Sequence, residues 1–105
     1  MNVTVSEVVR DEFNGLAQWY DAQPSKYGRA FLEEVQVALS AIEQNPRAHP
    51  PAEDGRPGCE DREYFIERFK QRVIFTVEGD DVYIHTVAHA NRRPGSWHRQ
   101  ASSDN

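Results

Sequence analysis

The spacing of the apolar residues changes halfway along this chain. In the first half it is the spacing of amphipathic helices, and in the second half short runs of Val, Ile, Phe and Tyr take over. Ser6 is a suitable N-cap for a first helix, in which Val9, Phe13, Leu16 and Tyr20 form one apolar stripe. The apolar face of such helices and the apolar face of a sheet bury each other when the helices pack on the sheet.

A second helix is predicted between Pro24 and the helix-stopping pair Asn45-Pro46. Its wide apolar face consists of Phe31, Leu32, Val35, Leu39 and Ile42. Only a few residues around Gln23-Pro24 separate the two helices, so we expect them to lie antiparallel as a helical hairpin.

Four segments are predicted to be strands: 2–5, 64–69, 71–78 and 82–89. Gly79-Asp80-Asp81 indicates a tight turn between the last two strands, and the Pro- and Gly-rich segment 47–62 indicates a loop. We therefore expect an α+β fold of order strand–helix–helix–strand–strand–strand. Its antiparallel sheet would carry the helical hairpin on one face and leave the other face at least partly open. Residues 1–99 would form one domain, and 100–105 a disordered polar tail.

Length and composition limit the classes of protein to which this chain can belong. A chain of 105 residues fits one domain with a modest core. It has no long apolar run, no secretory pattern at its start and a single cysteine, Cys59. From these features we expect a cytoplasmic protein.

The charge is unevenly distributed along the chain. The net charge is −5, which argues against broad non-specific binding to nucleic acid. Residues 1–55 carry four Lys and Arg against nine Asp and Glu, whereas Ala88 to Arg99 contains three arginines and no acidic residue. The C-terminal strand end is therefore either a locally basic surface or a set of solvated charges that favour solubility.

Polar and basic side chains are concentrated in the predicted strands and the segment that follows them: Arg68, Lys70, Arg72, Tyr83, His85, His89, Arg92 and Arg93. A ribonuclease that works without metal needs a base, an acid and cations for the phosphorane, and this set contains all three. Arg68, Lys70 and Arg72 alternate, so an unbroken strand would project them from one sheet face. The alternative is that they are ordinary solvent-facing cations.

Neither a metal nor a cofactor is expected. On a continuous strand His85 and His89 point the same way, but they lie about 13 Å apart and cannot share an ion. The chain contains no glycine-rich phosphate loop and no nucleophile elbow. Trp97 either packs back over the sheet edge or stands exposed as an interface anchor.

The second half of the chain also carries a family resemblance. Arg72-Val73-Ile74-Phe75 is followed by Val82-Tyr83-Ile84, then by Val87-Ala88-His89-Ala90-Asn91-Arg92-Arg93-Pro94, and finally by Trp97 and Arg99. With the helix-forming segments before it, this pattern resembles the RelE/ParE superfamily, the toxins of type II toxin–antitoxin modules and plasmid stabilisation systems.

The resemblance implies a growth inhibitor that forms a hetero-oligomer with a cognate antitoxin. RelE-like members cleave mRNA on the ribosome, whereas ParE-like members bind DNA gyrase. Lys70-Gln71 stands where the family commonly has Pro-Tyr, and the net charge of −5 is unlike the strongly basic nucleases. We therefore favour a non-enzymatic ParE-like toxin.

The residues expected to bind the target or the antitoxin are Arg72, His89, Arg92, Arg93, Trp97 and Arg99. The first alternative is a RelE-like, ribosome-dependent mRNA endonuclease. Its candidate catalytic residues are Arg68, Arg72, His89, Arg92 and Arg93. The second alternative is a non-toxic homologue that only binds an antitoxin.

Overall fold

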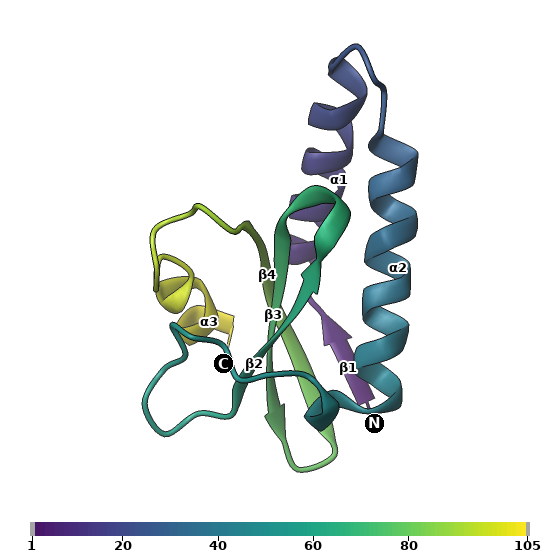
Figure 1. The fold of residues 1–105 in the computed structure, drawn as a ribbon. Coiled ribbons are helices and arrows are strands. Elements are labelled where there is room, and N and C mark those ends of the chain that lie inside the picture. The colour runs from purple at the N-terminus through teal and green to yellow at the C-terminus, as the bar shows by residue number, and fades with distance from the viewer. Residues whose placement is uncertain (1, 105) are drawn as a thin grey trace.

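A computed structural model describes residues 2–104 of the chain. A four-stranded sheet separates two unequal layers (Figure 1): the long helices α1 and α2 on one side and the short helix α3 on the other. The elements are β1 (Asn2–Val5), α1 (Glu7–Ala22), α2 (Gly28–Gln44), η1 (Pro46–Ala48), β2 (Asp61–Ile66), η2 (Glu67–Phe69), β3 (Gln71–Glu78), β4 (Asp81–His89) and α3 (His98–Asp104). The predicted α+β fold class and helical hairpin are confirmed. Among the described residues, no helix is both long and apolar enough to cross a membrane.

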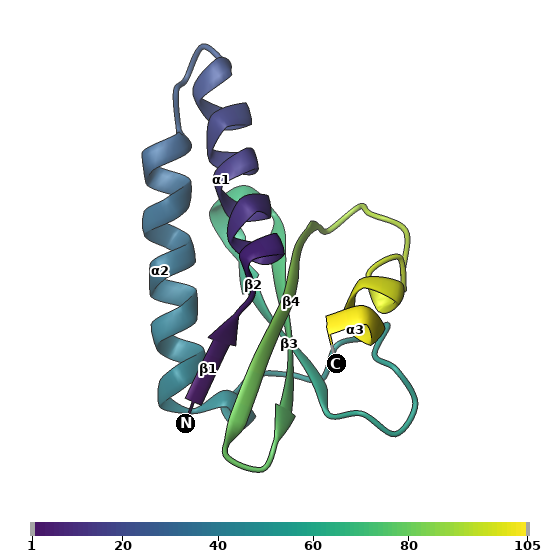
Figure 2. The same cartoon turned by 180° about the vertical axis from the view of Figure 1, so that it is seen from behind.

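The sheet is mixed rather than wholly antiparallel. Its strand order is β1-β4-β3-β2, and β1 pairs with β4 in parallel, with Val3 opposite Val82 (Figure 2). The helical hairpin returns the chain to the end of the sheet where β1 began. The two reversals from β2 to β3 and from β3 to β4 then leave β4 running in the same direction as β1.

The strand predicted over 64–69 is displaced toward the N-terminus. β2 covers Asp61–Ile66, η2 follows as a 3₁₀ turn, and Lys70 adopts left-handed backbone angles with φ 55°. Because the extended chain is interrupted here, Arg68 and Lys70 do not share a sheet face with Arg72. The prediction of three aligned cations on one strand is wrong.

The main core lies between the sheet and the helical hairpin. It includes Val9 and Phe13 from α1, Phe31 and Ile42 from α2, and Phe75 from β3, all buried. A smaller cluster of Ile74, Trp97 and Ala101 lies on the other face of the sheet, beneath α3.

The helix α3 corrects the expectation of a disordered tail beginning at Gln100. The segment is helical as far as Asp104, while Asn105 lies outside the described residues. The buried Ala101 joins it to the smaller cluster, and the Gln100 side-chain amide donates a hydrogen bond to the backbone oxygen of His85 at 2.6 Å.

A β-bulge at His85 changes which residues of β4 face each layer. In the β3–β4 register Ile74 is opposite Thr86 and Phe75 is opposite Ile84, so His85 has no partner across the ladder. His85 therefore stacks against Trp97 on one face, whereas His89 lies on the face of the helical hairpin. The expectation that both histidines point the same way is wrong, although the conclusion that they cannot share an ion still follows.

Gly28 is required where the first residue of α2 lies against α1. A Cβ atom at position 28 would lie 2.4 Å from the backbone oxygen of Ala17. The Gly28 N–H donates a hydrogen bond to the Asp21 carboxylate at 2.9 Å. Gly28→Ala is expected to lower the free energy of unfolding by about 2 kcal/mol through overpacking. Gly15→Ala is the matched control: that site in α1 has nothing within 4 Å, so alanine should stabilise the helix by about 0.5–1 kcal/mol. Urea denaturation measures both, and equal effects would contradict the packing argument.

Candidate functional site

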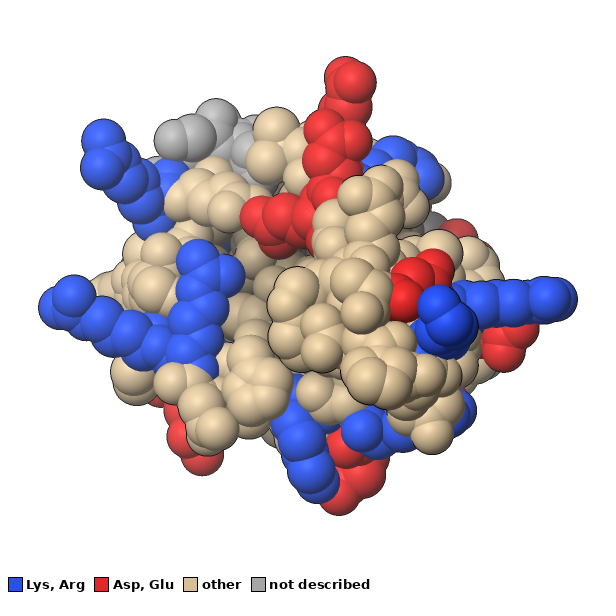
Figure 3. All heavy atoms as spheres, turned by 90° about the horizontal axis from the view of Figure 1, so that it is seen from above, with Lys and Arg blue, Asp and Glu red and all other residues tan. Residues whose placement is uncertain are grey.

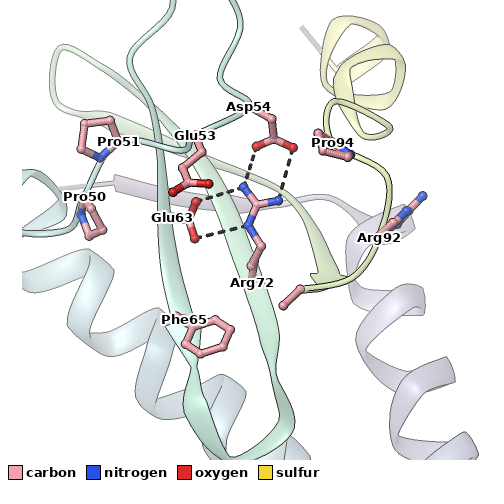
Figure 4. A pocket seen from close by; sticks show the side chains of 10 residues that line it. Pro50, Pro51, Glu53, Asp54, Glu63, Phe65, Arg72, Arg92 and Pro94 are labelled. Carbon is pink, nitrogen blue, oxygen red and sulfur yellow. Dashed lines mark hydrogen bonds and ion pairs between the residues drawn. The ribbon is translucent and has the colours of Figure 1, made fainter.

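A cleft of about 600 Å³ lies beside β3 on the sheet face away from the helical hairpin (Figure 4). Pro50, Pro51, Phe65 and Pro94 form much of its wall, and the charged residues that line it are Glu53, Asp54, Glu63, Arg72 and Arg92. We refer to it as the open-face cleft. Three carboxylates and two guanidinium groups therefore share this surface.

Two carboxylates hold Arg72 inside the open-face cleft. The Arg72 Nη2 atom lies 2.5 Å from Asp54 Oδ1 and 3.0 Å from Glu63 Oε1, and further hydrogen bonds join Nη1 to Asp54 and Nε to Glu63. The side chains of Arg72 and Asp54 are only 13% and 8% exposed, so water screens the pair weakly. The hydrogen bond to Asp54 raises the pKa of Arg72 above its ordinary value. The Arg72 guanidinium therefore stays protonated, and its positive charge is balanced by the two carboxylates that it contacts.

Asp54 also forms hydrogen bonds with the segment that follows β4. One of its oxygens accepts hydrogen bonds from the Gly95 N–H at 2.8 Å and from Trp97 Nε1 at 2.9 Å. Burial by itself would raise the pKa of Asp54. The hydrogen bonds from Arg72, Gly95 and Trp97 outweigh that effect and hold the pKa well below its usual range.

The lowered pKa of Asp54 predicts a loss of stability in acid. The pKa of Asp54 is lower in the folded than in the unfolded chain, so ionised Asp54 stabilises the fold above the ordinary aspartate pKa of about 3.9. That contribution should decline as the pH falls below about 4 toward the folded-state pKa. Urea midpoints measured between pH 7 and pH 3 test this. In Asp54→Asn the midpoint should start lower and fall less, and an equally steep fall would contradict the assignment.

A second buried polar cluster lies deeper under Trp97. Arg56 donates to both oxygens of Asp61, each at 3.0 Å, and also to Thr76 Oγ1 at 3.0 Å. The Thr76 hydroxyl donates to Asp61, so it can only accept from His85 Nε2, which lies 2.6 Å away. His85, Thr76 and Asp61 are buried at 0%, 1% and 4% exposure, and the Arg56 side chain is 12% exposed. We therefore assign this cluster a structural role in the β3–β4 region rather than a catalytic one.

A groove of about 450 Å³ lies near the opposite sheet face, between α1 and the start of β3. It is lined by Leu16, Trp19, Tyr20, Arg68, Phe69, Lys70, Gln71 and His89, and we refer to it as the hairpin groove. The Gln71 side-chain amide donates to the Tyr20 hydroxyl at 3.1 Å. Two cations and an imidazole thus border an aromatic floor with no carboxylate among the lining residues.

The predicted site residues are divided between these two surfaces. Arg72 and Arg92 line the open-face cleft, while Arg68, Lys70 and His89 line the hairpin groove. Arg93 and Arg99 are exposed beyond β4, and Tyr83 is half-buried in β4. Trp97 is 1% exposed, so its packing interpretation is confirmed, and in this structure it is not an exposed anchor.

Sequence reasoning missed the acidic half of the open-face cleft. Asp54 lies in the predicted loop 47–62 and Glu63 directly follows it, 18 and 9 residues before the arginine that they contact. It also missed Trp19, which is 57% exposed at the hairpin groove. The one available signal was that the aromatic pair Trp19-Tyr20 ends the first amphipathic stripe.

No family model and no curated protein sequence matches this chain. Solved structures do resemble it. A chain of the chromosomal ParDE TA system from P. aeruginosa has a TM-score of 0.67 at 18% identity, over 85% of this chain and 95% of that one. The isolated E. coli RelE toxin has a TM-score of 0.53 at 17% identity, over 98% and 96%. Both comparisons span most of each chain, from the sheet to the helical hairpin, and the protein therefore has the RelE/ParE toxin fold.

Proposed function

We propose that this protein is the toxin of a type II toxin–antitoxin module, that a cognate antitoxin neutralises it, and that it acts in the cytoplasm. The fold supports the proposal, because the similar structures are described as belonging to a ParDE TA system and as a RelE toxin. The residue pattern from Arg72 to Arg99 supports it independently of the fold. Among the targets of such toxins we propose DNA gyrase, bound without catalysis.

We prefer a gyrase-binding toxin to a ribonuclease because carboxylates already pair with Arg72. A metal-independent ribonuclease needs cations that are available to the phosphorane. In the open-face cleft the Arg72 guanidinium is held by both Asp54 and Glu63, and Glu53 adds a third carboxylate. An RNA phosphate entering here would meet negative charge, which disfavours cleavage at this surface.

The alternative is a ribosome-dependent endonuclease, and one observation favours it. His89 shares the hairpin groove with Arg68, Lys70 and the Tyr20 hydroxyl, so an imidazole, cations and a phenol do occur together. That set excludes Arg72, Arg92 and Arg93, which were the remaining candidates. The groove floor is also mainly aromatic and aliphatic. We therefore rank cleavage second.

Three measurements distinguish the possibilities. Induction without an antitoxin should arrest growth, and the purified protein should inhibit DNA supercoiling by gyrase while leaving mRNA intact on translating ribosomes. A protein that arrests growth but leaves supercoiling unchanged would overturn the gyrase assignment. Codon-linked mRNA cuts that disappear in a folded His89→Ala variant would establish the nuclease, and normal growth on induction would establish a non-toxic antitoxin-binding homologue.

A further inference from the structure

We infer that the open-face cleft binds an arginine-bearing segment of a partner protein, and that Glu53 and Glu63 balance the charge of the arginine. The cleft combines apolar walls with more carboxylates than cations, in a volume of about 600 Å³. This binding requires neither gyrase as the target nor toxicity, and it therefore goes beyond the proposed function.

The walls of the cleft are held in place before any ligand binds. On one side the backbone oxygen of Pro50 accepts the Glu63 N–H at 3.0 Å. On the other side the Gly95 N–H donates to Asp54 at 2.8 Å, which fixes the neighbouring Pro94. Pro50 and Pro94 stand on opposite sides of the cleft (Figure 4). A cleft formed in advance loses little conformational entropy when a ligand enters it.

The charges in the cleft leave an excess of negative charge. The single positive charge of Arg72 faces the two negative charges of Asp54 and Glu63. Glu53 adds a further carboxylate, which is exposed and has no hydrogen bond or ion pair within residues 2–104. Arg92, the other cation of the lining, is exposed and points away from Arg72 (Figure 4). A cation that enters the cleft is therefore attracted to it.

Glu63 keeps the capacity to accept hydrogen bonds from a ligand. Its two carboxylate oxygens each accept one hydrogen bond from Arg72, at 3.0 Å and 3.3 Å, and each oxygen has two lone pairs. The Glu63 side chain is 16% exposed. Asp54 Oδ2, by contrast, already accepts three hydrogen bonds from the protein itself. Glu63 and the unpaired Glu53 are therefore the carboxylates that a ligand can use.

Phe65 supplies an aromatic face for the same cation. The residue is 39% exposed in β2 and lines the cleft. The Lys70 Nζ atom lies 5.9 Å from the centre of the Phe65 ring, so a cation reaches this ring from solvent. Lys70 is itself paired with Glu67, and that pair adds little net charge. Arginine suits the site because its planar guanidinium stacks on aromatic rings and is more weakly hydrated than an ammonium group.

The end of the molecule at which the helical hairpin turns is a poorer site for this ligand. Figure 3 views that end, and Lys and Arg side chains stand on several sides of the uncharged surface in the middle of the view. The hairpin groove likewise has Arg68 and Lys70 but no carboxylate among its lining residues. A basic segment is repelled by such surfaces and attracted where carboxylates outnumber cations.

A protein segment fits the open-face cleft better than nucleic acid or a free cation. The carboxylates of the cleft repel phosphate groups, and a free cation gains no contact with the proline and phenylalanine walls. An arginine flanked by apolar residues uses both the charge and the walls. The probe is therefore a short, labelled synthetic peptide with one arginine among leucine and alanine residues. Its controls are the same peptide with citrulline in place of arginine, the same peptide with glutamate there, and an RNA oligonucleotide.

Titration of the full chain with the arginine peptide, followed by fluorescence anisotropy, should give saturable binding that weakens as salt is added. Citrulline has nearly the shape of arginine but no charge, so its peptide should bind about tenfold more weakly. Absence of saturable binding by the arginine peptide, equal binding of the citrulline peptide, or tighter binding of the glutamate peptide or the RNA would each overturn the inference.

Two exposed glutamates provide a matched pair that locates the binding. Glu53→Gln and Glu43→Gln each remove one negative charge, and Glu43 lies on α2 and does not line the cleft. Glu53→Gln should weaken binding of the arginine peptide about fivefold, whereas Glu43→Gln should leave it within about twofold. Equal affinities in the two variants would place the peptide elsewhere and overturn the assignment. Urea midpoints close to that of the unaltered chain exclude misfolding, and absence of toxicity in cells leaves a dissociation constant unaffected.

Phe65→Leu separates the aromatic contact from simple apolar contact. Leucine keeps an apolar side chain in β2 but has no ring for the guanidinium to stack on. The variant should bind the arginine peptide about threefold more weakly and should affect the citrulline peptide less, because the attraction to the ring depends on the positive charge. An equal loss for both peptides would contradict the contact between Phe65 and the cation.

Discussion

Asp54→Ala is expected to lower the free energy of unfolding by about 3 kcal/mol, because it removes one partner from a buried, hydrogen-bonded ion pair. The change leaves Arg72 with only Glu63, and it also removes the acceptor for the Gly95 N–H and for Trp97 Nε1. Urea denaturation at pH 7 measures the loss. A decrease below about 1 kcal/mol would show that the network contributes little to stability.

Glu53→Ala is the control for that experiment. Glu53 lines the same open-face cleft and is exposed, and among residues 2–104 it has no hydrogen bond or ion pair. The substitution should change the free energy of unfolding by no more than about 0.5 kcal/mol. A large effect would mean that the net charge of the cleft, rather than the contacts of Asp54, determines stability.

Trp97→Ala is expected to cost about 4 kcal/mol, since it empties the space between the sheet and α3. Trp97 is buried against Ile74 and Ala101, and its ring stacks on His85 with the centroids 6.1 Å apart. Trp97→Phe keeps an aromatic ring but loses the Nε1–H donor to Asp54, so it should cost about 1–2 kcal/mol. Guanidinium denaturation measures all of these variants.

The double variant Asp54→Ala and Trp97→Ala tests whether the two residues act together. Because they share a hydrogen bond, their combined effect should be smaller than the sum of the single effects. A Trp97→Ala variant that keeps its full stability but no longer binds a partner would instead make Trp97 an interface anchor.

Local patterns were enough to predict the helical hairpin and the last two strands. The stripe from Val9 to Tyr20 and the Gly79 turn both depend on neighbouring residues, which a sequence displays directly. The start of β2 was missed because Asp61, Arg62 and Glu63 are charged and follow a loop-like segment. Asp61 is nevertheless 4% exposed, since Arg56 neutralises it inside the fold.

The candidate site was harder to predict, because it depends on contacts that leave no local pattern. The arginines were visible in the sequence, but the carboxylates that neutralise Arg72 come from a different segment of the chain. The bulge at His85 likewise depends on the pairing of two strands, and it sends His89 to the hairpin groove instead of toward Trp97. The sequence therefore located the arginines of the C-terminal segment, but it did not show on which surfaces they lie.

The parallel pairing of β1 with β4 determines when the sheet can form while the chain is being synthesised. The Asn2 N–H donates to the Asp80 oxygen at 2.9 Å, and Val5 is opposite Ile84, so β1 is synthesised well before the strand with which it pairs. Contacts of such long sequence separation slow folding, because the intervening chain must be ordered before they form. A nascent copy that ends before Ile84 cannot complete the sheet, because β1 then lacks the strand with which it pairs.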